Sequence, residues 1–511
     1  ERDKARMFSQ LGRHGLRFVV DYLPGIAKHF DRCLDQGFYQ PFEGFLGRPR
    51  KNKDGGSGPL FLGYLYRRIF DKDAKLRVDA SIASISAIRQ LLLGLKKIVG
   101  ECSDDVINNE IDNFVEIERV ARSPFFNWRD DECEFKGSVK FLDRSSTRDG
   151  RGRFVRKPTK QLSADLDRLH SVCDMVSAML GDFHNESPTE LPKHGPGAVS
   201  NLSFQQWKYN FPSWSDRIER IFPYTRYACA NEALALVDGN CLSPVSYDSR
   251  LVVVPKTLKA PRLIAAEPVE NQWVQQVILN QIVRRIAQTP IAASIRFNSQ
   301  EANQKAAVQG SIDGSNATVD LSSASDRLSC WTVERVFRRN ISLLERLHAS
   351  RSQAISLKDF GRGSLPLKKF STMGSACTFP VQTVVYALMA ISLGITGKVT
   401  IGSVRKSASK VQVFGDDIIL PRENLDRLRE MLTFFGLKVN DDKTFGGANF
   451  RESCGVDAFQ GHDVSPVYIK HFAEEKSPFS KVSSYVAHAN NLYLAGLWNA
   501  ANGYRERIGL G

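Results

Sequence analysis

The tetrapeptide Phe414-Gly415-Asp416-Asp417 constrains the fold more than any other part of the sequence. It follows the β-prone run 411–413 and precedes a second apolar run, 418–420, which ends at Pro421. This pattern predicts a β-hairpin whose tight turn carries two adjacent carboxylates. Two neighbouring negative charges are costly to hold together unless a cation neutralises them, and carboxylate oxygens suit Mg²⁺. The alternative is an ordinary solvated turn, because acidic residues are common at turns.

The overall charge favours a polyanionic partner. The 511 residues include 70 Lys and Arg against 56 Asp and Glu, which gives a net charge of +14. Nucleic acid and an anionic membrane surface both fit such a charge. The most apolar window, 378–395, is interrupted by Pro380 and Gln382, so it predicts a buried helix and not a membrane span. Nine scattered cysteines without a CxxC pair favour a reducing compartment. We therefore expect a cytoplasmic protein without a membrane partner.

A basic strip follows a predicted strand at 251–254. Lys256, Lys259 and Arg262 lie at and between two prolines, which favour an extended backbone. Cations spaced in this way could hold a triphosphate and its leaving pyrophosphate. A solubilising loop explains the strip equally well.

Two more carboxylates lie in the segment 317–326. A short β-run ends at Asp320, where a carboxylate could share a metal with residues from a neighbouring strand. Asp326 precedes a predicted helix at 331–337. It either caps this helix or accepts a hydrogen bond from a nucleotide 2′-hydroxyl.

Small residues and a lysine complete the pattern. Gly374 and Ser375 precede the apolar helix, where small side chains let the backbone approach a ligand closely. After the acidic turn, an amphipathic stretch at 425–435 predicts a helix, and a return strand then leads to Lys443. Lys443 is either a proton donor to a leaving group or an inert exposed lysine.

A second group of cations lies between residues 144 and 160. A solvated loop and a phosphate-binding segment are equally good interpretations of this run. Its cations are Arg144, Arg148, Arg151, Arg153, Arg156, Lys157 and Lys160.

The order of these segments resembles motifs F, A, B, C and D of template-directed RNA polymerases. The resemblance is closer still to replicase β subunits of the single-stranded RNA bacteriophages of the levivirus type. It covers residues 252–471 and departs from the phage pattern at Ser375-Ala376, where Asn-Gly is expected. The matching stretches are VPKTLKAPRLIAAEP at 254–268, ATVDLSSASDRLS at 317–329, STMGSACTF at 371–379, FGDDIILP at 414–421, DKTF at 442–445, FRESCG at 450–455 and VSPVYIKH at 464–471.

This resemblance implies an RNA-directed RNA polymerase that replicates a positive-strand phage genome by two-metal nucleotidyl transfer. Asp320, Asp416 and Asp417 would ligate two Mg²⁺ ions, for which Mn²⁺ would substitute, and Lys443 would be the general acid. Asp326, assisted by Ser375, would read the ribose. The full set of nucleotide-binding residues would be Lys256, Lys259, Arg262, Asp326, Gly374 and Ser375.

The implied fold is an α+β right hand with fingers, thumb and an antiparallel-sheet palm backed by helices. The expected divisions are an N-terminal region and fingers at 1–309, palm at 310–330 and 366–470, a fingers insertion at 331–365, and a short or truncated thumb at 471–511. Expected partners are RNA template and product, nucleoside triphosphates and, by resemblance, host elongation factors Tu and Ts and a ribosomal protein. The location would be the cytoplasm of a bacterial host cell. The alternatives are a reverse transcriptase-like polymerase and a non-catalytic RNA-binding fragment.

Overall fold

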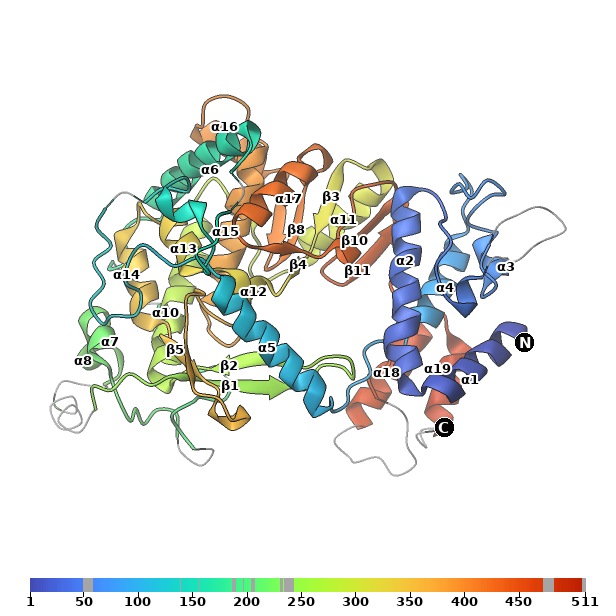
Figure 1. The fold of residues 1–511 in the computed structure, drawn as a ribbon, viewed down its shortest axis with the longest axis horizontal. Helices are drawn as coiled ribbons and strands as arrows, with labels where there is room; N and C mark the ends of the chain where they lie inside the picture. Colours follow the sequence, from blue (N-terminus) through green and yellow to red (C-terminus); the bar gives the residue numbers. More distant parts are fainter. Residues whose placement is uncertain are drawn as a thin grey trace.

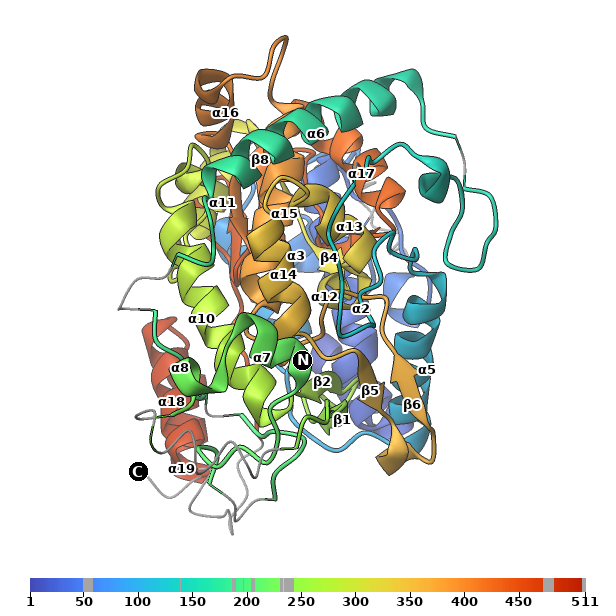
Figure 2. The same ribbon diagram turned by 90° about the vertical axis from the view of Figure 1, so that its left-hand side faces the viewer.

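A computed structural model of the chain describes all residues except 49–57, 138, 156, 186–189, 196, 204–206, 230–232, 234–242, 472–481 and 508–511. Helices and short, mostly antiparallel strands form three packed groups (Figures 1 and 2). This mixture confirms the predicted α+β class. Within the described ranges, no helix is both long and apolar enough to span a bilayer. All eight described cysteines are free thiols.

The central group surrounds α15 (Thr378–Leu393), whose side chains are almost all buried. A helix that is apolar on every face must be packed on every side, which confirms the buried helix predicted from the sequence. A three-stranded sheet of order β3-β8-β7 covers it together with several helices. The strands are β3 (Asn316–Val319), β7 (Gln412–Phe414) and β8 (Asp417–Pro421), and the helices of this group are α6 (Lys160–Met179), α7 (Asp216–Ile221), α8 (Tyr224–Tyr227), α10 (Val269–Ile286), α12 (Ala324–Arg327), α13 (Cys330–Val336), α14 (Ile341–Ser350), α16 (Ile401–Ala408) and α17 (Leu425–Phe434).

The second group is a four-stranded sheet of order β2-β1-β5-β6 covered by α5 (Asp104–Val120). Ile111 and Phe114 of the helix pack against Leu251 and Ile355 of the sheet. Strand β1 pairs antiparallel with β2 and parallel with β5, and it contains the strand predicted at 251–254. The strands are β1 (Ser249–Val254), β2 (Arg262–Ala266), β5 (Ala354–Ser356) and β6 (Ser364–Pro366).

The third group joins N-terminal helices to a sheet of order β10-β11-β12 (Figure 1). Phe30 and Leu34 of α2 share one core with Phe450 and Phe459 of that sheet, although about 420 residues of sequence separate them. The elements of this side are α1 (Arg2–His14), α2 (Leu23–Gln36), α3 (Gly63–Tyr66), α4 (Ile82–Leu93), α18 (Val482–Leu494), α19 (Trp498–Arg507), β10 (Phe450–Ser453), β11 (Val456–Phe459) and β12 (His462–Asp463). Helix α11 (Glu301–Asp313) packs against β10 and β11 and links this sheet to β3.

Arg89 of α4 is a buried polar link within the third group. Its side chain is 2% exposed and donates to the carboxylates of Asp31 in α2 and Asp457 in β11. Its Nε also donates to the carbonyl of Val464 at 3.1 Å. A buried cation is tolerated here because both carboxylates and a carbonyl surround it.

We expect Arg89→Ala to lower the free energy of unfolding by about 3–5 kcal/mol, because it leaves two buried carboxylates without their cation. Urea unfolding followed by far-UV circular dichroism measures this loss. The matched control is Arg77→Ala, which removes an exposed ion pair with Asp79 and should leave the unfolding midpoint nearly unchanged. Equal losses in the two variants would contradict a special role for Arg89.

Candidate active site

The hairpin predicted around the acidic turn is present. Strands β7 and β8 pair antiparallel, with Phe414 opposite Asp417 and with Gly415 and Asp416 at the turn. Gly415 has a φ of 64°, a left-handed conformation that glycine adopts without a steric penalty. Its N–H donates to Thr383 Oγ1 of α15 at 3.1 Å, so the buried helix fixes the turn.

Asp320 is brought to this turn by strand pairing. It follows β3 directly, and β3 pairs antiparallel with β8 so that Val319 lies opposite Ile418. Asn440 donates from its side-chain Nδ2 to Asp320 Oδ2 at 2.7 Å and from its main-chain N–H to the Asp320 carbonyl at 2.9 Å. Asn440 follows β9 (Lys438–Val439), which pairs with β4 (Leu321–Ser322). Asn440 was not among the predicted site residues, although it lies at the end of the return strand predicted from the sequence.

Asp417 is held by the turn between β10 and β11. The main-chain N–H of Cys454 and the hydroxyl of Ser453 each lie 3.4 Å from Asp417 Oδ1. The thiol of Cys454 lies 3.5 Å from Oδ2. Cys454 has a φ of 49°, and this left-handed conformation directs both its N–H and its thiol toward the carboxylate.

The three carboxylates repel one another. Burial, followed by the charges of Asp416 and Asp320, raises the pKa of Asp417 to about 6. Burial also raises the pKa of Asp320 and that of Asp416, and in Asp320 the charge of Asp416 adds to the effect. The structure therefore concentrates negative charge where little water can solvate it.

Lys443 is the nearest cation to these carboxylates. Its Nζ lies 3.8 Å from Asp320 Oδ1 and 3.2 Å from Glu452 Oε1. Burial alone would lower the pKa of Lys443, but Glu452 and Asp320 together raise it above its ordinary value. Lys443 is thus a protonated side chain beside the carboxylates and is not a free surface lysine. Glu452 was not found from the sequence because nothing local indicates its partner.

The donor set fits a hard divalent cation. Asp320, Asp416 and Asp417 offer carboxylate oxygens with uncompensated charge, which are the ligands that Mg²⁺ prefers. Among the described residues, no three His, Cys, Asp or Glu side chains form a ready-made metal cage. Mg²⁺ commonly takes only one or two carboxylates and completes its shell with water and substrate phosphates.

The basic strip lies in the loop between β1 and β2 and ends at Arg262, the first residue of β2, and the charges of Lys256 and Arg262 act on Asp416. Partial burial and the neighbouring Arg262 and Lys443 lower the pKa of Lys256, and the charges of Asp416 and Asp320 oppose this effect. Lys256 and Arg262 therefore share an electrostatic environment with the acidic residues.

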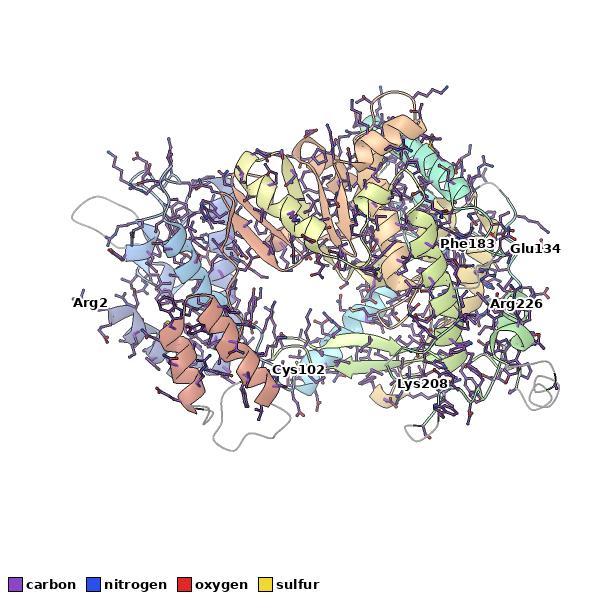
Figure 3. The ribbon with its side chains drawn as sticks, turned by 180° about the vertical axis from the view of Figure 1, so that it is seen from behind. Arg2, Cys102, Glu134, Phe183, Lys208 and Arg226 are labelled. Carbon is purple, nitrogen blue, oxygen red and sulfur yellow. The ribbon has the colours of Figure 1, made fainter. Side chains whose placement is uncertain are left out.

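The third cation of the strip, Lys259, forms an ion pair outside the acidic site. Its Nζ lies 2.9 Å from Asp21 Oδ1, in the N-terminal group. The same loop contacts that group again, since Leu258 packs against its core and the Leu258 N–H donates to the Ile98 carbonyl at 3.1 Å. The Cys102 thiol, just before α5, donates to the Thr257 carbonyl at 3.3 Å. Cys102 is labelled in Figure 3, close to the sheet that contains β1 and β2.

Asp326 is not a helix cap. It lies inside the short helix α12, and the following helix α13 is capped by Ser329, whose hydroxyl accepts the N–H of Thr332. The capping interpretation was therefore wrong. Lys369 Nζ lies 3.8 Å from Asp326 Oδ1 and 3.8 Å from Glu118 Oε2, in a side chain with no exposed surface. Lys369 thus forms a buried ion pair with Asp326. No local pattern in the sequence predicts this contact.

The small-residue loop lies against β2. Ala265 N–H donates to the Met373 carbonyl at 2.7 Å. Gly374 has a φ of 124°, and a Cβ there would lie 1.9 Å from the Ala265 carbonyl oxygen. Only glycine fits this close approach. Ser375 is 9% exposed, and its hydroxyl accepts the N–H of Cys377 at 3.3 Å.

Part of the chain is similar in sequence to known proteins. Residues 144–493 match the family described as RNA replicase, beta-chain. The chain is 34% identical over 303 residues to the RNA-directed RNA polymerase beta chain of Enterobacteria phage fr, covering 53% of this chain and 51% of that one. It is 36% identical over 254 residues to the RNA-directed RNA polymerase subunit beta of Qbeta virus (strain MX1), covering 49% and 40%. The matches thus span about half of these relatives or less.

Among solved structures, a partial match is to the BmCPV RNA-dependent RNA polymerase at the elongation state. The TM-score is 0.49 at 11% identity, and the match covers 96% of this chain and 45% of that one.

We expect Mg²⁺ to stabilise the folded protein more at about pH 7.5 than at about pH 5. The pKa of Asp417 is raised from its ordinary value of 3.8 to about 6, so the folded state keeps a proton that the unfolded state releases. The free energy of unfolding therefore falls as the pH rises from 3.8 to about 6. Above that range Asp417 is ionised in the folded protein, and Mg²⁺ can neutralise its charge. Melting temperatures with and without Mg²⁺ at both pH values measure the effect.

Asp417→Asn is neutral at every pH and should lose most of this Mg²⁺ effect. The exposed Glu423→Gln is the matched control and should retain it. An equal response to Mg²⁺ at both pH values would count against metal binding at Asp417.

Proposed function

The chain belongs to the RNA replicase β-chain family, and we propose that it is an RNA-directed RNA polymerase that copies a positive-strand phage genome. The observation that carries the proposal is the meeting of Asp320, Asp416 and Asp417 beside Lys443, in a site on which the charges of Lys256 and Arg262 also act. A non-catalytic RNA-binding protein has no need for three mutually repelling, partly buried carboxylates around one turn.

The reaction is nucleotidyl transfer, with Asp320, Asp416 and Asp417 as the metal-holding residues. Two Mg²⁺ ions would supply activation of the primer 3′-hydroxyl and neutralise charge on the pyrophosphate, and Mn²⁺ would serve in their place. Lys256 and Arg262 bind the incoming triphosphate. Lys443 carries a proton on Nζ and delivers it to the departing pyrophosphate oxygen.

The ribose is read by Asp326. Its carboxylate accepts the 2′-hydroxyl of the incoming nucleotide, and Lys369 positions it through the 3.8 Å contact. Ser375 assists from the loop that Gly374 lets approach β2. Lys259 binds nucleotide phosphate only if it leaves Asp21, so it contributes less than the other two cations of the strip.

In this proposal the architecture is a right hand. The sheet β3-β8-β7 with its helices is the palm, the sheet β2-β1-β5-β6 belongs to the fingers, and α18 and α19 begin the thumb. The insertion at 331–365 contributes β5 and β6 to the fingers sheet. RNA and nucleoside triphosphates are the substrates, in the cytoplasm of a bacterial host, with elongation factors Tu and Ts and a ribosomal protein as host partners.

Asp416→Asn should lower the rate of template-directed RNA synthesis by roughly 1000-fold, because a lost metal ligand removes several kcal/mol of transition-state stabilisation. A primer-extension assay with Mg²⁺ measures the rate, and fluorescence anisotropy measures RNA affinity, which should stay near that of the unaltered protein. The exposed Asp426→Asn on α17 is the charge-matched control. Undiminished synthesis by Asp416→Asn would refute the catalytic assignment.

Asp326→Asn should weaken the preference for ribonucleotides over deoxyribonucleotides by about tenfold, because the charged acceptor for the 2′-hydroxyl is lost. The ratio of kcat/KM for a matched rNTP and dNTP measures this preference. A reverse transcriptase-like enzyme would instead prefer dNTPs before any substitution is made.

A further inference from the structure

A cavity of about 370 Å³ with a mixed polar and apolar lining lies outside the acidic site, between the C-terminal ends of α5 and α17, the helix α12 and the segment 149–155. Arg122 and Arg327 both line it. Within the described part of the chain, Nη1 of Arg122 and Nε of Arg327 are buried without a hydrogen-bond partner. Two guanidinium groups that line one cavity, each with one nitrogen left unpaired, are typical of a site for an anion.

Arg122 is held in place by aromatic rings. Its guanidinium carbon lies 4.6 Å from the ring centroid of Trp331 and 4.6 Å from that of Phe434. Burial, followed by the nearby Arg335, lowers the pKa of Arg122 to about 10, although Asp143 and Asp149 act in the opposite direction. The cation is therefore positioned but not fully neutralised, and an anionic ligand would reduce the cost of burying it.

Asp149 is the one carboxylate among the described residues that line the cavity, and both of its oxygens already have partners within its own segment. Its Oδ1 accepts the main-chain N–H groups of Arg151 and Arg153 at 2.9 Å each. Its Oδ2 also lies 3.3 Å from Arg153 Nε. These contacts shape the turn of the 144–155 segment and leave the two unused guanidinium donors without an anion.

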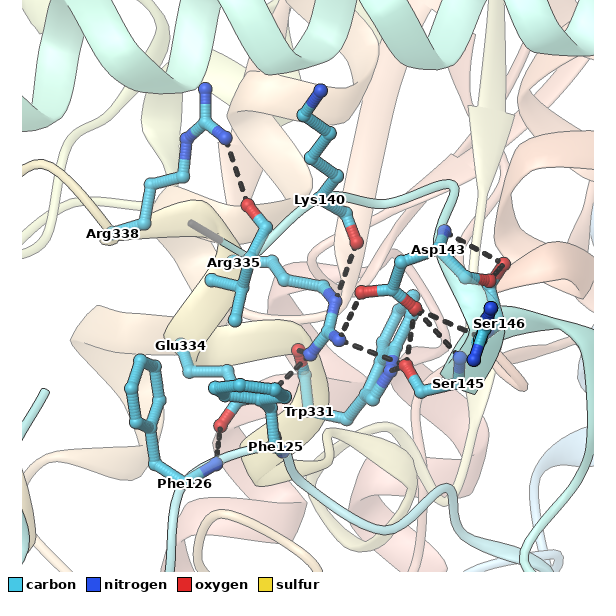
Figure 4. Close-up of polar contacts among 12 residues, drawn as sticks. Phe125, Phe126, Lys140, Asp143, Ser145, Ser146, Trp331, Glu334, Arg335 and Arg338 are labelled. Atoms are coloured by element: carbon cyan, nitrogen blue, oxygen red, sulfur yellow. Dashed lines mark hydrogen bonds and ion pairs between the residues drawn. The ribbon is translucent and has the colours of Figure 1, made fainter. Parts of the chain in front are cut away.

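The base of this segment is anchored to α13, as Figure 4 shows. Arg335, which has no exposed side-chain surface, donates to Asp143 Oδ2 at 2.7 Å and to Ser145 Oγ at 2.9 Å. Trp331 Nε1 donates to the same hydroxyl at 2.8 Å. The Trp331 side chain thus fixes the base of the segment and also forms one wall of the Arg122 site.

The other end of the segment is fixed against α5. Gly150 N–H donates to the Val120 carbonyl at 3.0 Å, and a Cβ at Gly150 would lie 2.0 Å from the Ala121 carbonyl oxygen. The rim of the cavity is therefore a preformed surface.

This rim presents an aromatic ring to solvent. Phe154 is 78% exposed, and the guanidinium carbon of Arg148 lies 4.0 Å from its ring centroid. Exposed aromatic rings beside cations are the platforms on which single-stranded nucleic acids stack their bases. Arg151 is paired with Glu116, and Arg156 lies outside the described residues.

We propose that this cavity binds a backbone phosphate of a single-stranded RNA segment through Arg122 and Arg327, and that Phe154 stacks on a neighbouring base. RNA as the occupant rests on the proposed polymerase function, whereas the phosphate chemistry rests on the two arginines. The phosphate-binding arginines of this site lie outside the 144–160 run, so phosphate contact by the cations of that run stays a prediction.

The test measures binding of a fluorescent single-stranded oligouridylate to the full chain over a range of salt concentrations. Arg122→Gln should weaken binding by about tenfold and reduce the slope of log K against log salt by about 0.7, which corresponds to one lost phosphate contact. Phe154→Ala should weaken binding by about tenfold and leave the slope unchanged, because stacking releases no counterion. The exposed Arg405→Gln on α16 is the charge-matched control and should change neither quantity.

Crosslinking with 4-thiouridine RNA locates the contact, and we expect a crosslink to Phe154 that the Phe154→Ala variant lacks. Unchanged affinity and slope in both variants would overturn the proposal, and so would a loss of free nucleoside triphosphate binding with RNA binding intact. If Arg122→Gln does not fold, the RNA affinity of the exposed Phe154→Ala variant alone tests the proposal. These binding assays need no synthesis, so normal RNA binding by Arg122→Gln refutes only this site. Absence of template-directed synthesis by the unaltered protein would refute only the polymerase function.

Discussion

The antiparallel pairing of β3 with β8 is the constraint on which the candidate active site depends. Val319 lies opposite Ile418, and this register places Asp320 beside Asp417 although almost a hundred residues separate them in sequence. A slip of one residue would move every side chain of β3 to the opposite face of the sheet. The register is secured because Ala317 and Val319 of β3, like Ile418 and Leu420 of β8, are buried in the central core.

The local parts of this site were predictable from the sequence. The β-hairpin, the strand before Asp320 and the buried helix 378–395 each have a distinctive apolar period or a turn residue, and the structure contains all three. Such patterns work because backbone geometry and burial are decided within a few residues.

The supporting residues could not be predicted in the same way. Lys369 contacts Asp326 across 43 residues, and Arg122 meets Trp331 across more than 200, so no local pattern encodes either contact. The capping role predicted for Asp326 was wrong for a local reason. Its position before a helix suggested a cap, but Asp326 lies in a separate short helix, α12, and Ser329 caps the next helix. Lys259 has the same spacing as its neighbours in the basic strip, yet Asp21 in a distant part of the chain determines its direction.

The loop that carries the basic strip also connects the sheet β2-β1-β5-β6 to the N-terminal group. It contacts the N-terminal group at Asp21 and through Leu258, and that group shares its core with the strands on either side of Cys454. The basic loop and the turn that contacts Asp417 are therefore both packed against the N-terminal group.

The thiol of Cys454 has a consequence for which cations the site accepts. Burial and the charge of Asp417 raise its pKa to about 12, so it remains a neutral thiol at physiological pH. A neutral thiol is a poor metal ligand, since cysteine binds soft cations as the thiolate. The Cys454 thiol therefore donates a hydrogen bond to a carboxylate oxygen of Asp417, and oxygen atoms are the donors that Asp320, Asp416 and Asp417 offer to a cation. Such a donor set suits a hard cation such as Mg²⁺.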